Sequence, residues 1–185
     1  IVLYNDNSRI EELTRFNMLR QQKFSGEHSF CLSDFIAPQK TGIDDYIGAF
    51  AVTAGIGASR LAGKYEASGD DYNAIMVKAL ADRRADAFAE RLHQEARAAW
   101  GFPDDAAITN DNLNKEKYRG IRPAFGYPAC PDHSEKEKLF DILDTPSVGI
   151  NLTENYSMFP AASVSGLYFS NKKARYFTVG RINQS

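Results

Sequence analysis

The chain has 185 residues, of which 43% are hydrophobic, so it is large enough for one domain with a real core. Its formal net charge of −2 argues against nucleic acid as the main partner, because phosphate binding needs a surplus of Lys and Arg. Apolar runs stay shorter than a membrane span, and Cys31 and Cys130 are too few for a disulfide scaffold, so we expect a cytoplasmic protein without a membrane partner.

The first part of the chain is predicted to contain one helix among strands. Ser8 begins S-R-I-E, a capping box in which the serine hydroxyl and Glu11 satisfy exposed amides at a helix start. Apolar residues then recur at helical spacing, which predicts a helix over Arg9–Gln22. Apolar, β-rich segments predict strands at Ile1–Tyr4, Phe30–Ala37 and Tyr46–Thr53.

Two helices are predicted in the middle of the chain. A short helix is expected over Ser59–Glu66, and a long one follows from a cap at Asp70 or Asp71 to Trp100. The apolar stripe of the long helix is expected to contain Ile75, Ala79 or Leu80, Phe88 and Leu92.

Acidic side chains recur every four residues on a neighbouring face of that helix. Asp82, Asp86 and Glu90 share this face, with His93 one turn further on. Two interpretations remain open, because repulsion between like charges at this spacing costs only a few tenths of a kcal/mol. The face is either an ordinary solvated surface, balanced by nearby arginines, or an acidic rail toward a cationic partner, for which Asp82 and Asp86 are the best candidates.

The last third is predicted to be mixed. A short helix over Asp111–Tyr118 precedes a second one over Glu135–Leu143, which begins at a capping box on Ser134. Extended segments follow, and the last two are expected to pair as an antiparallel hairpin; the segments are Gly149–Thr153, Tyr156–Phe159, Val164–Phe169 and Arg175–Val179. The expected class is α+β, a single domain with an antiparallel sheet flanked by helices.

The segment from Arg122 to His133, R-P-A-F-G-Y-P-A-C-P-D-H, is the strongest candidate for a binding site. Its three prolines fix φ and remove backbone donors, so it is a stiff loop that loses little entropy on binding. The alternative is a rigid turn that only links two helices. Cys130 and His133 have C-x-x-H spacing, but a metal site would need two further ligands, so we expect no metal.

This loop also carries a resemblance to a known family. R-P-A-x-G-Y-P followed by C-P-D-H-S-E-K resembles the AdoMet-binding signature in the C-terminal activation domain of cobalamin-dependent methionine synthase, with Phe125 where the family usually has Pro. Further matching segments follow the family's order: D-F-I-A-P, D-Y-I-G-A-F-A-V, D-D-Y-N-A-I-M-V-K-A-L-A-D-R, L-T-E-N and S-G-L-Y-F-S. The resemblance implies that residues 1–185 are a fragment, lacking the N-terminal part of that domain and its C-terminal helix.

The resemblance implies a binding site for S-adenosylmethionine. Arg122 suits its carboxylate, Glu116 its ammonium, and an aromatic ring its sulfonium or adenine. The full set expected at AdoMet is Glu116, Arg122, Ala124, Gly126, Tyr127, Tyr176 and Phe177. Tyr127 and His133 are expected near the corrin face of cobalamin, and Asp82 and Asp86 against the cobalamin-binding module.

The implied function is reductive methylation of inactive cob(II)alamin to methylcobalamin, which reactivates methionine synthase. Cobalamin would be carried by a neighbouring module of the same polypeptide, and flavodoxin or an equivalent reductase would supply the electron. Two other functions remain open: a module that senses AdoMet without methyl transfer, and a docking domain for the flavoprotein.

Overall fold

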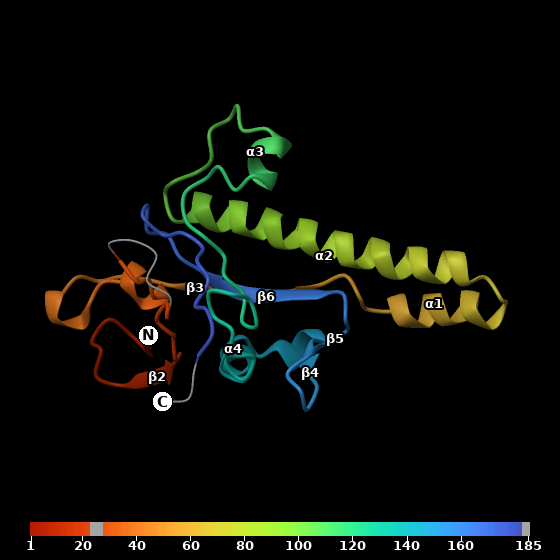
Figure 1. The fold of residues 1–185 in the computed structure, drawn as a ribbon, viewed down its shortest axis with the longest axis horizontal. Coiled ribbons are helices and arrows are strands. Elements are labelled where there is room, and N and C mark those ends of the chain that lie inside the picture. The colour runs from red at the N-terminus through yellow and green to blue at the C-terminus, as the bar shows by residue number, and fades with distance from the viewer. Residues whose placement is uncertain (23–27, 183–185) are drawn as a thin grey trace.

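The computed structural model describes residues 1–22 and 28–182, and a short antiparallel ribbon lies at its centre (Figure 1). Strand β3 (Gly48–Thr53) pairs with β6 (Ser163–Tyr168) in continuous register along its whole length. The long helix α2 (Asp71–Ala99) lies on one side of this ribbon and α4 (Glu135–Leu143) on the other. The expected α+β class with antiparallel pairing between helices is therefore confirmed.

Smaller elements surround the ribbon. β1 (Val2–Tyr4) pairs with β2 (Glu12–Arg15), and β4 (Asn151–Leu152) pairs with β5 (Met158–Phe159), both antiparallel. The other elements are the helices α1 (Ala58–Ala67) and α3 (Asn110–Asn114) and the 3₁₀ turns Leu32–Phe35, Gln39–Thr41 and Thr145–Val148.

The alternation of side chains along β3 gives the ribbon a core on each face. Phe50 and Val52 are buried on the face that packs against α2. Ala49 lies on the opposite face, where it packs against a larger cluster that contains Leu139 of α4 and Leu167 of β6. Burial on both faces explains why this strand reads as an uninterrupted apolar run.

Helix α2 has the predicted length but buries a different stripe from the one predicted. Its cap is confirmed, because the Asp70 carboxylate accepts a hydrogen bond of 3.1 Å from the Asn73 amide. The predicted apolar stripe is wrong at Ile75, Leu80 and Phe88, which are 66%, 55% and 49% exposed, and right at Leu92, which packs against the ribbon. The buried residues of the helix are Ala74, Ala81, Ala85, Ala89, His93 and Arg97. Alanines occupy most of the buried face of α2, because their small side chains let α1 and the ribbon approach the helix closely.

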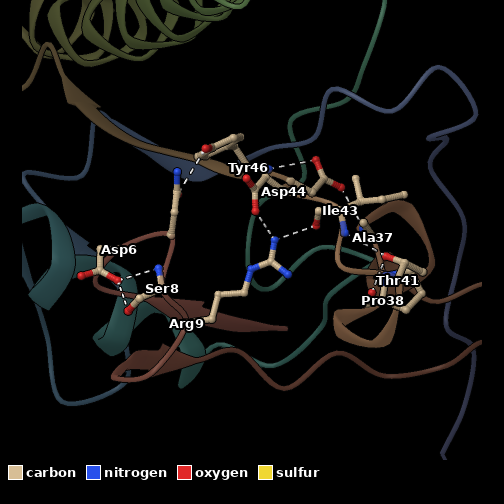
Figure 2. Close-up of polar contacts among 11 residues, drawn as sticks. Asp6, Ser8, Arg9, Ala37, Pro38, Thr41, Ile43, Asp44 and Tyr46 are labelled. Atoms are coloured by element: carbon tan, nitrogen blue, oxygen red, sulfur yellow. Dashed lines mark hydrogen bonds and ion pairs between the residues drawn. The ribbon is translucent and has the colours of Figure 1, made fainter.

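The predicted helix over Arg9–Gln22 is wrong. The Ser8 hydroxyl and amide both donate to Asp6, so the capping box does not form, and Arg9 lies in the left-handed region with φ of +55°. Its guanidinium donates to the Ile43 carbonyl at 2.8 Å and pairs with Asp44 (Figure 2). These contacts tie the N-terminal turn to the segment before β3, and the chain continues as strand β2.

Three further elements differ from prediction. The strand expected over Phe30–Ala37 is a 3₁₀ turn, in which the Asp34 carboxylate accepts from the Cys31 amide at 2.9 Å. The helix expected over Asp111–Tyr118 stops as α3 because Glu116 has φ of +50°. The terminal hairpin is wrong, since β6 pairs with β3, while 175–179 runs along the proline-rich loop and Val179 donates to the Pro128 carbonyl at 2.8 Å.

The helix predicted over Glu135–Leu143 is confirmed as α4, although the capping box at Ser134 is not. The Ser134 hydroxyl and amide both donate to Asp132 rather than across the first turn. No helix in the described part of the chain has the length and apolar character that a membrane span requires.

Candidate functional site

The proline-rich loop is held beside β6 by its first residues and closes into a tight turn. Ile121 exchanges two backbone hydrogen bonds with Phe169, at 3.0 and 2.9 Å, and Pro123 accepts one from Leu167 at 3.0 Å. The loop then turns between Gly126 and Cys130, whose backbone groups bond at 2.8 Å. The segment is therefore an ordered extension of the ribbon, as its stiffness predicts.

Phe125 anchors the loop to the core. Its side chain is 3% exposed, and its ring lies 5.4 Å from that of Phe16. The Cys130 thiol is also buried beneath the turn and lies 3.0 Å from the Ala124 carbonyl. Burial raises the pKa of Cys130 to about 12, so this thiol stays protonated and serves packing.

A cavity of about 570 Å³ opens between this loop, β3, β6 and the C-terminal segment. It has an aromatic and apolar body and one charged end, which is typical of a small-molecule site. Its lining residues are Phe50, Asp86, Glu116, Arg122, Pro123, Ala124, Tyr127, Pro128, Ala129, Val164, Tyr176, Phe177 and Thr178. We call this cavity the slot.

Most residues expected at AdoMet line the slot. Six of the seven do so: Glu116, Arg122, Ala124, Tyr127, Tyr176 and Phe177. Gly126 lies outside the lining, and its amide is used by the turn. Of the residues expected at cobalamin or its module, Tyr127 and Asp86 line the slot, whereas Asp82 and His133 do not.

The charged end of the slot is built around Arg122. A guanidinium nitrogen, Nη2, lies 2.8 Å from Glu90 Oε2, and both side chains are about four-fifths buried, at 22% and 19% exposed. The Arg122 amide donates to the Tyr176 hydroxyl at 3.1 Å. Burial raises the pKa of Tyr176 to about 12, so its hydroxyl is neutral at physiological pH.

Glu90 was not foreseen as a site residue. Asp82 and Asp86 are exposed, which fits both a solvated face and an acidic rail, but Glu90 and His93 are largely withdrawn from water, so the solvated-face interpretation is wrong for them. Burial raises the pKa of Glu90, while the nearby Arg122 opposes this shift. The helical spacing does place Glu90 beside the buried Ala89, but no pattern in the sequence pairs it with Arg122.

A stack of three aromatic rings connects the interior of the domain to the wall of the slot. The His93 imidazole lies 4.8 Å from the Tyr168 ring, and that ring lies 4.6 Å from Phe50, which lines the slot. His93 is 1% exposed, and burial, followed by the charge of Arg97, lowers its pKa to about 3. His93 is therefore a neutral packing group rather than part of an acidic rail.

His133 lies behind the turn. Its imidazole packs directly against Gly126, and its Nδ1 is 2.9 Å from the Lys136 ammonium. Within the described residues, no group of three His, Cys, Asp or Glu side chains gathers closely enough to hold a metal ion.

The fold and the slot together define a small-molecule-binding α+β domain whose pocket joins an aromatic body to an arginine-bearing end. The whole chain, residues 1–185, matches the family described as the activation domain of vitamin B12-dependent methionine synthase. The chain belongs to this family.

A solved structure supports the same assignment. The chain is similar to "MetH Reactivation Domain bound to AdoHcy", with 48% sequence identity and a TM-score of 0.94. The match covers 98% of this chain and 57% of that one, so the chain spans a little over half the length of its structural relative.

Proposed function

We propose that the chain binds S-adenosylmethionine in the slot and positions it for the reductive methylation of cob(II)alamin to methylcobalamin, which reactivates methionine synthase. The observation that carries this proposal is the gathering of Glu116, Arg122 and Tyr176 around one cavity, although they come from separate segments. The solved relative with 48% identity is described as bound to AdoHcy, the demethylated form of this ligand.

The chemistry of the slot suits each part of the ligand. The Arg122 guanidinium would hold the carboxylate, because its planar donors match that group. Glu116 and Asp86, which line the same end, would attract the ammonium. Ala124, Tyr176 and Phe177 would enclose the nucleoside, and the cavity volume of about 570 Å³ lies within the range of such sites.

Unused binding capacity at the charged end supports this fit. Among buried side-chain atoms of the described residues, Arg122 Nε and Glu90 Oε1 have no hydrogen-bond partner. Buried polar atoms usually have partners, so this end of the slot has hydrogen-bonding capacity that the described residues do not use. The Arg122 side chain is 22% exposed, so its accessible guanidinium nitrogens would meet a ligand carboxylate while Nε stays buried.

The side chains of this domain would orient the sulfonium methyl group and keep water away, while bound cobalamin would supply the methyl acceptor. Tyr127 lines the slot and is 66% exposed, so its ring would cover the outer side of the ligand. We propose Tyr127 and His133 at the corrin face, and exposed Asp82 and Asp86 at the surface of the cobalamin-binding module.

A second surface suits the electron-donating partner. A groove of about 820 Å³ runs along α1 and α2, and its described lining contains three cations, Arg60, Lys64 and Arg84, and no acid. Exposed Leu80 and Phe88 add apolar area. We propose that an acidic flavoprotein reductase, such as flavodoxin, docks in this groove, because opposite charges steer association. The two buried, free cysteines are compatible with the cytoplasmic location that we propose.

Calorimetric titration with AdoMet tests the binding part of this proposal. Saturable heat is expected, and its absence would leave only a docking role. The second step adds the cobalamin-loaded module, a reductant and AdoMet labelled in its methyl group. Labelled methylcobalamin is expected, and failure to form it after confirmed binding would favour AdoMet sensing.

A further inference from the structure

We propose that Glu90 is a positioning residue, which holds the Arg122 guanidinium ready for the carboxylate of the ligand. This inference rests on the proposed function, since it assigns a role within the same site. Glu90 does not line the slot, but it lies directly behind a residue that does. It would therefore act on the ligand through Arg122.

The two side chains form a close, largely buried ion pair. Arg122 Nη2 and Glu90 Oε2 are 2.8 Å apart, and both side chains are largely withdrawn from water. The Tyr118 hydroxyl lies 3.4 Å from the same carboxylate oxygen. An unpaired arginine side chain samples many rotamers, and the ion pair with Glu90 restricts them before the ligand binds.

The pairing leaves the guanidinium available rather than blocking it. The contact to Glu90 comes from Nη2, and the Arg122 side chain keeps 22% of its surface exposed where it lines the slot. A guanidinium carries five N–H donors, so one contact to Glu90 leaves donors for a second carboxylate. Glu90 and the ligand carboxylate would thus bind different nitrogens of the same Arg122 guanidinium.

The surrounding charges favour retention of the Glu90 charge when a ligand carboxylate arrives. Glu90 faces two cations, Arg122 and Arg97, which oppose the rise in its pKa caused by burial. The other charged or titratable groups facing it are Tyr118 and Glu116, and the adjacent His93 is neutral. Two cations, Arg122 and Arg97, therefore lie near Glu90. Of these two, only Arg122 lines the slot.

Glu90→Gln tests this role, because it keeps the shape of the side chain and removes its charge. The probes are S-adenosylhomocysteine, which has the amino-acid carboxylate, and 5′-methylthioadenosine, which lacks it. Calorimetry is expected to show about tenfold weaker binding of S-adenosylhomocysteine and unchanged binding of 5′-methylthioadenosine. Glu90→Gln is expected to add no further loss in an Arg122→Ala background, because the two residues act as one unit.

Matched variants separate positioning from stability. Glu95→Gln, on the same helix, removes an exposed carboxylate that pairs with Arg91, and it is expected to change neither affinity. Glu90→Asp keeps the charge but shortens the reach, so it is expected to lose affinity for S-adenosylhomocysteine alone. It also serves as the test if Glu90→Gln fails to fold.

Three outcomes would overturn the positioning role while leaving the proposed function intact. They are unchanged or tighter binding of S-adenosylhomocysteine by the Glu90 variants, an equal loss for both probes, and additive losses with Arg122→Ala. Failure of the unsubstituted chain to bind S-adenosylhomocysteine would instead overturn the proposed function, and the positioning role with it.

Discussion

The His133 imidazole lies directly against Gly126, so that a Cβ atom at Gly126 would come within 2.2 Å of His133 Cε1. Gly126 also has φ of +95°, a backbone conformation that other residues adopt only with strain. Two independent constraints thus require glycine where the proline-rich loop turns. The turn thereby sets the position of Tyr127, the next residue in the chain, which lines the slot.

Gly126→Ala is expected to lower the free energy of unfolding by about 1–3 kcal/mol, because it introduces both backbone strain and the clash with His133. Denaturant unfolding followed by circular dichroism measures this change. Gly63→Ala is the control: nothing lies within 4 Å of its added Cβ inside α1, and alanine there should stabilise by about 0.5–1 kcal/mol.

The double variant Gly126→Ala/His133→Ala separates the two causes. Removal of the imidazole is expected to restore part of the lost stability, while the strain at φ remains. Identical midpoints for Gly126→Ala and the unsubstituted chain would contradict the packing of His133 on the turn.

His93 is expected to make stability fall in mild acid. Its folded pKa, about 3, lies below its ordinary value near 6.5, so the unfolded chain binds the proton more tightly. The contribution of neutral His93 to the free energy of unfolding is complete above pH 6.5 and is lost as pH falls toward 3. The slope approaches about 1.4 kcal/mol per pH unit in that window.

The measurement is the free energy of unfolding between pH 7 and 4, compared between variants. His93→Phe keeps a ring beside Tyr168 and should flatten the profile, because it removes the titrating group. Gly63→Ala, which removes no titrating group, should leave the slope in place. An unchanged slope in His93→Phe would show that His93 is not the group responsible.

Charge reversal in the groove along α1 and α2 is expected to slow reduction by the flavoprotein. Arg60→Glu/Lys64→Glu replaces two of the three cations in the described lining with anions. Stopped-flow reduction should show a lower second-order rate at low salt, and the difference should shrink as salt screens the charges. AdoMet affinity should stay the same, because neither residue lines the slot.

A groove without a docking role would give a different result. Equal reduction rates for the charge-reversed and unsubstituted chains at low salt would remove the reductase from this surface. Asp111→Asn on α3, an exposed acid outside the groove, provides a control for nonspecific charge effects.

The parts of the site that sequence analysis predicts correctly are those that follow from local chemistry. Pro123 and Pro128 stiffen the loop in any context, and Arg122 and Tyr127 lie within the motif itself. Among the confirmed helices, α2 begins at the local cap on Asp70, and α1 and α4 follow from helix-forming runs without a side-chain cap. Family resemblance supplied Tyr176 and Phe177, which are distant in sequence and line the same cavity.

The errors arise where long-range contacts override local patterns. Ser8 has the pattern of a helix cap, yet it bonds to Asp6 while Arg9 reaches Asp44 across the fold. β6 has a strand pattern, but the choice of β3 as its partner depends on packing that no local signal encodes. The ion pair of Glu90 could not be predicted from a local pattern, because its partner, Arg122, lies 32 positions away in the chain.

The most direct test of the slot as the binding site is calorimetric titration with S-adenosylhomocysteine. The titration compares the unsubstituted chain with Arg122→Ala. Arg122→Ala is expected to weaken binding by more than ~1 kcal/mol, because it removes a buried charged contact. Arg60→Ala, outside the slot, should bind as tightly as the unsubstituted chain. Equal affinity of Arg122→Ala and the unsubstituted chain would contradict the assignment of the slot.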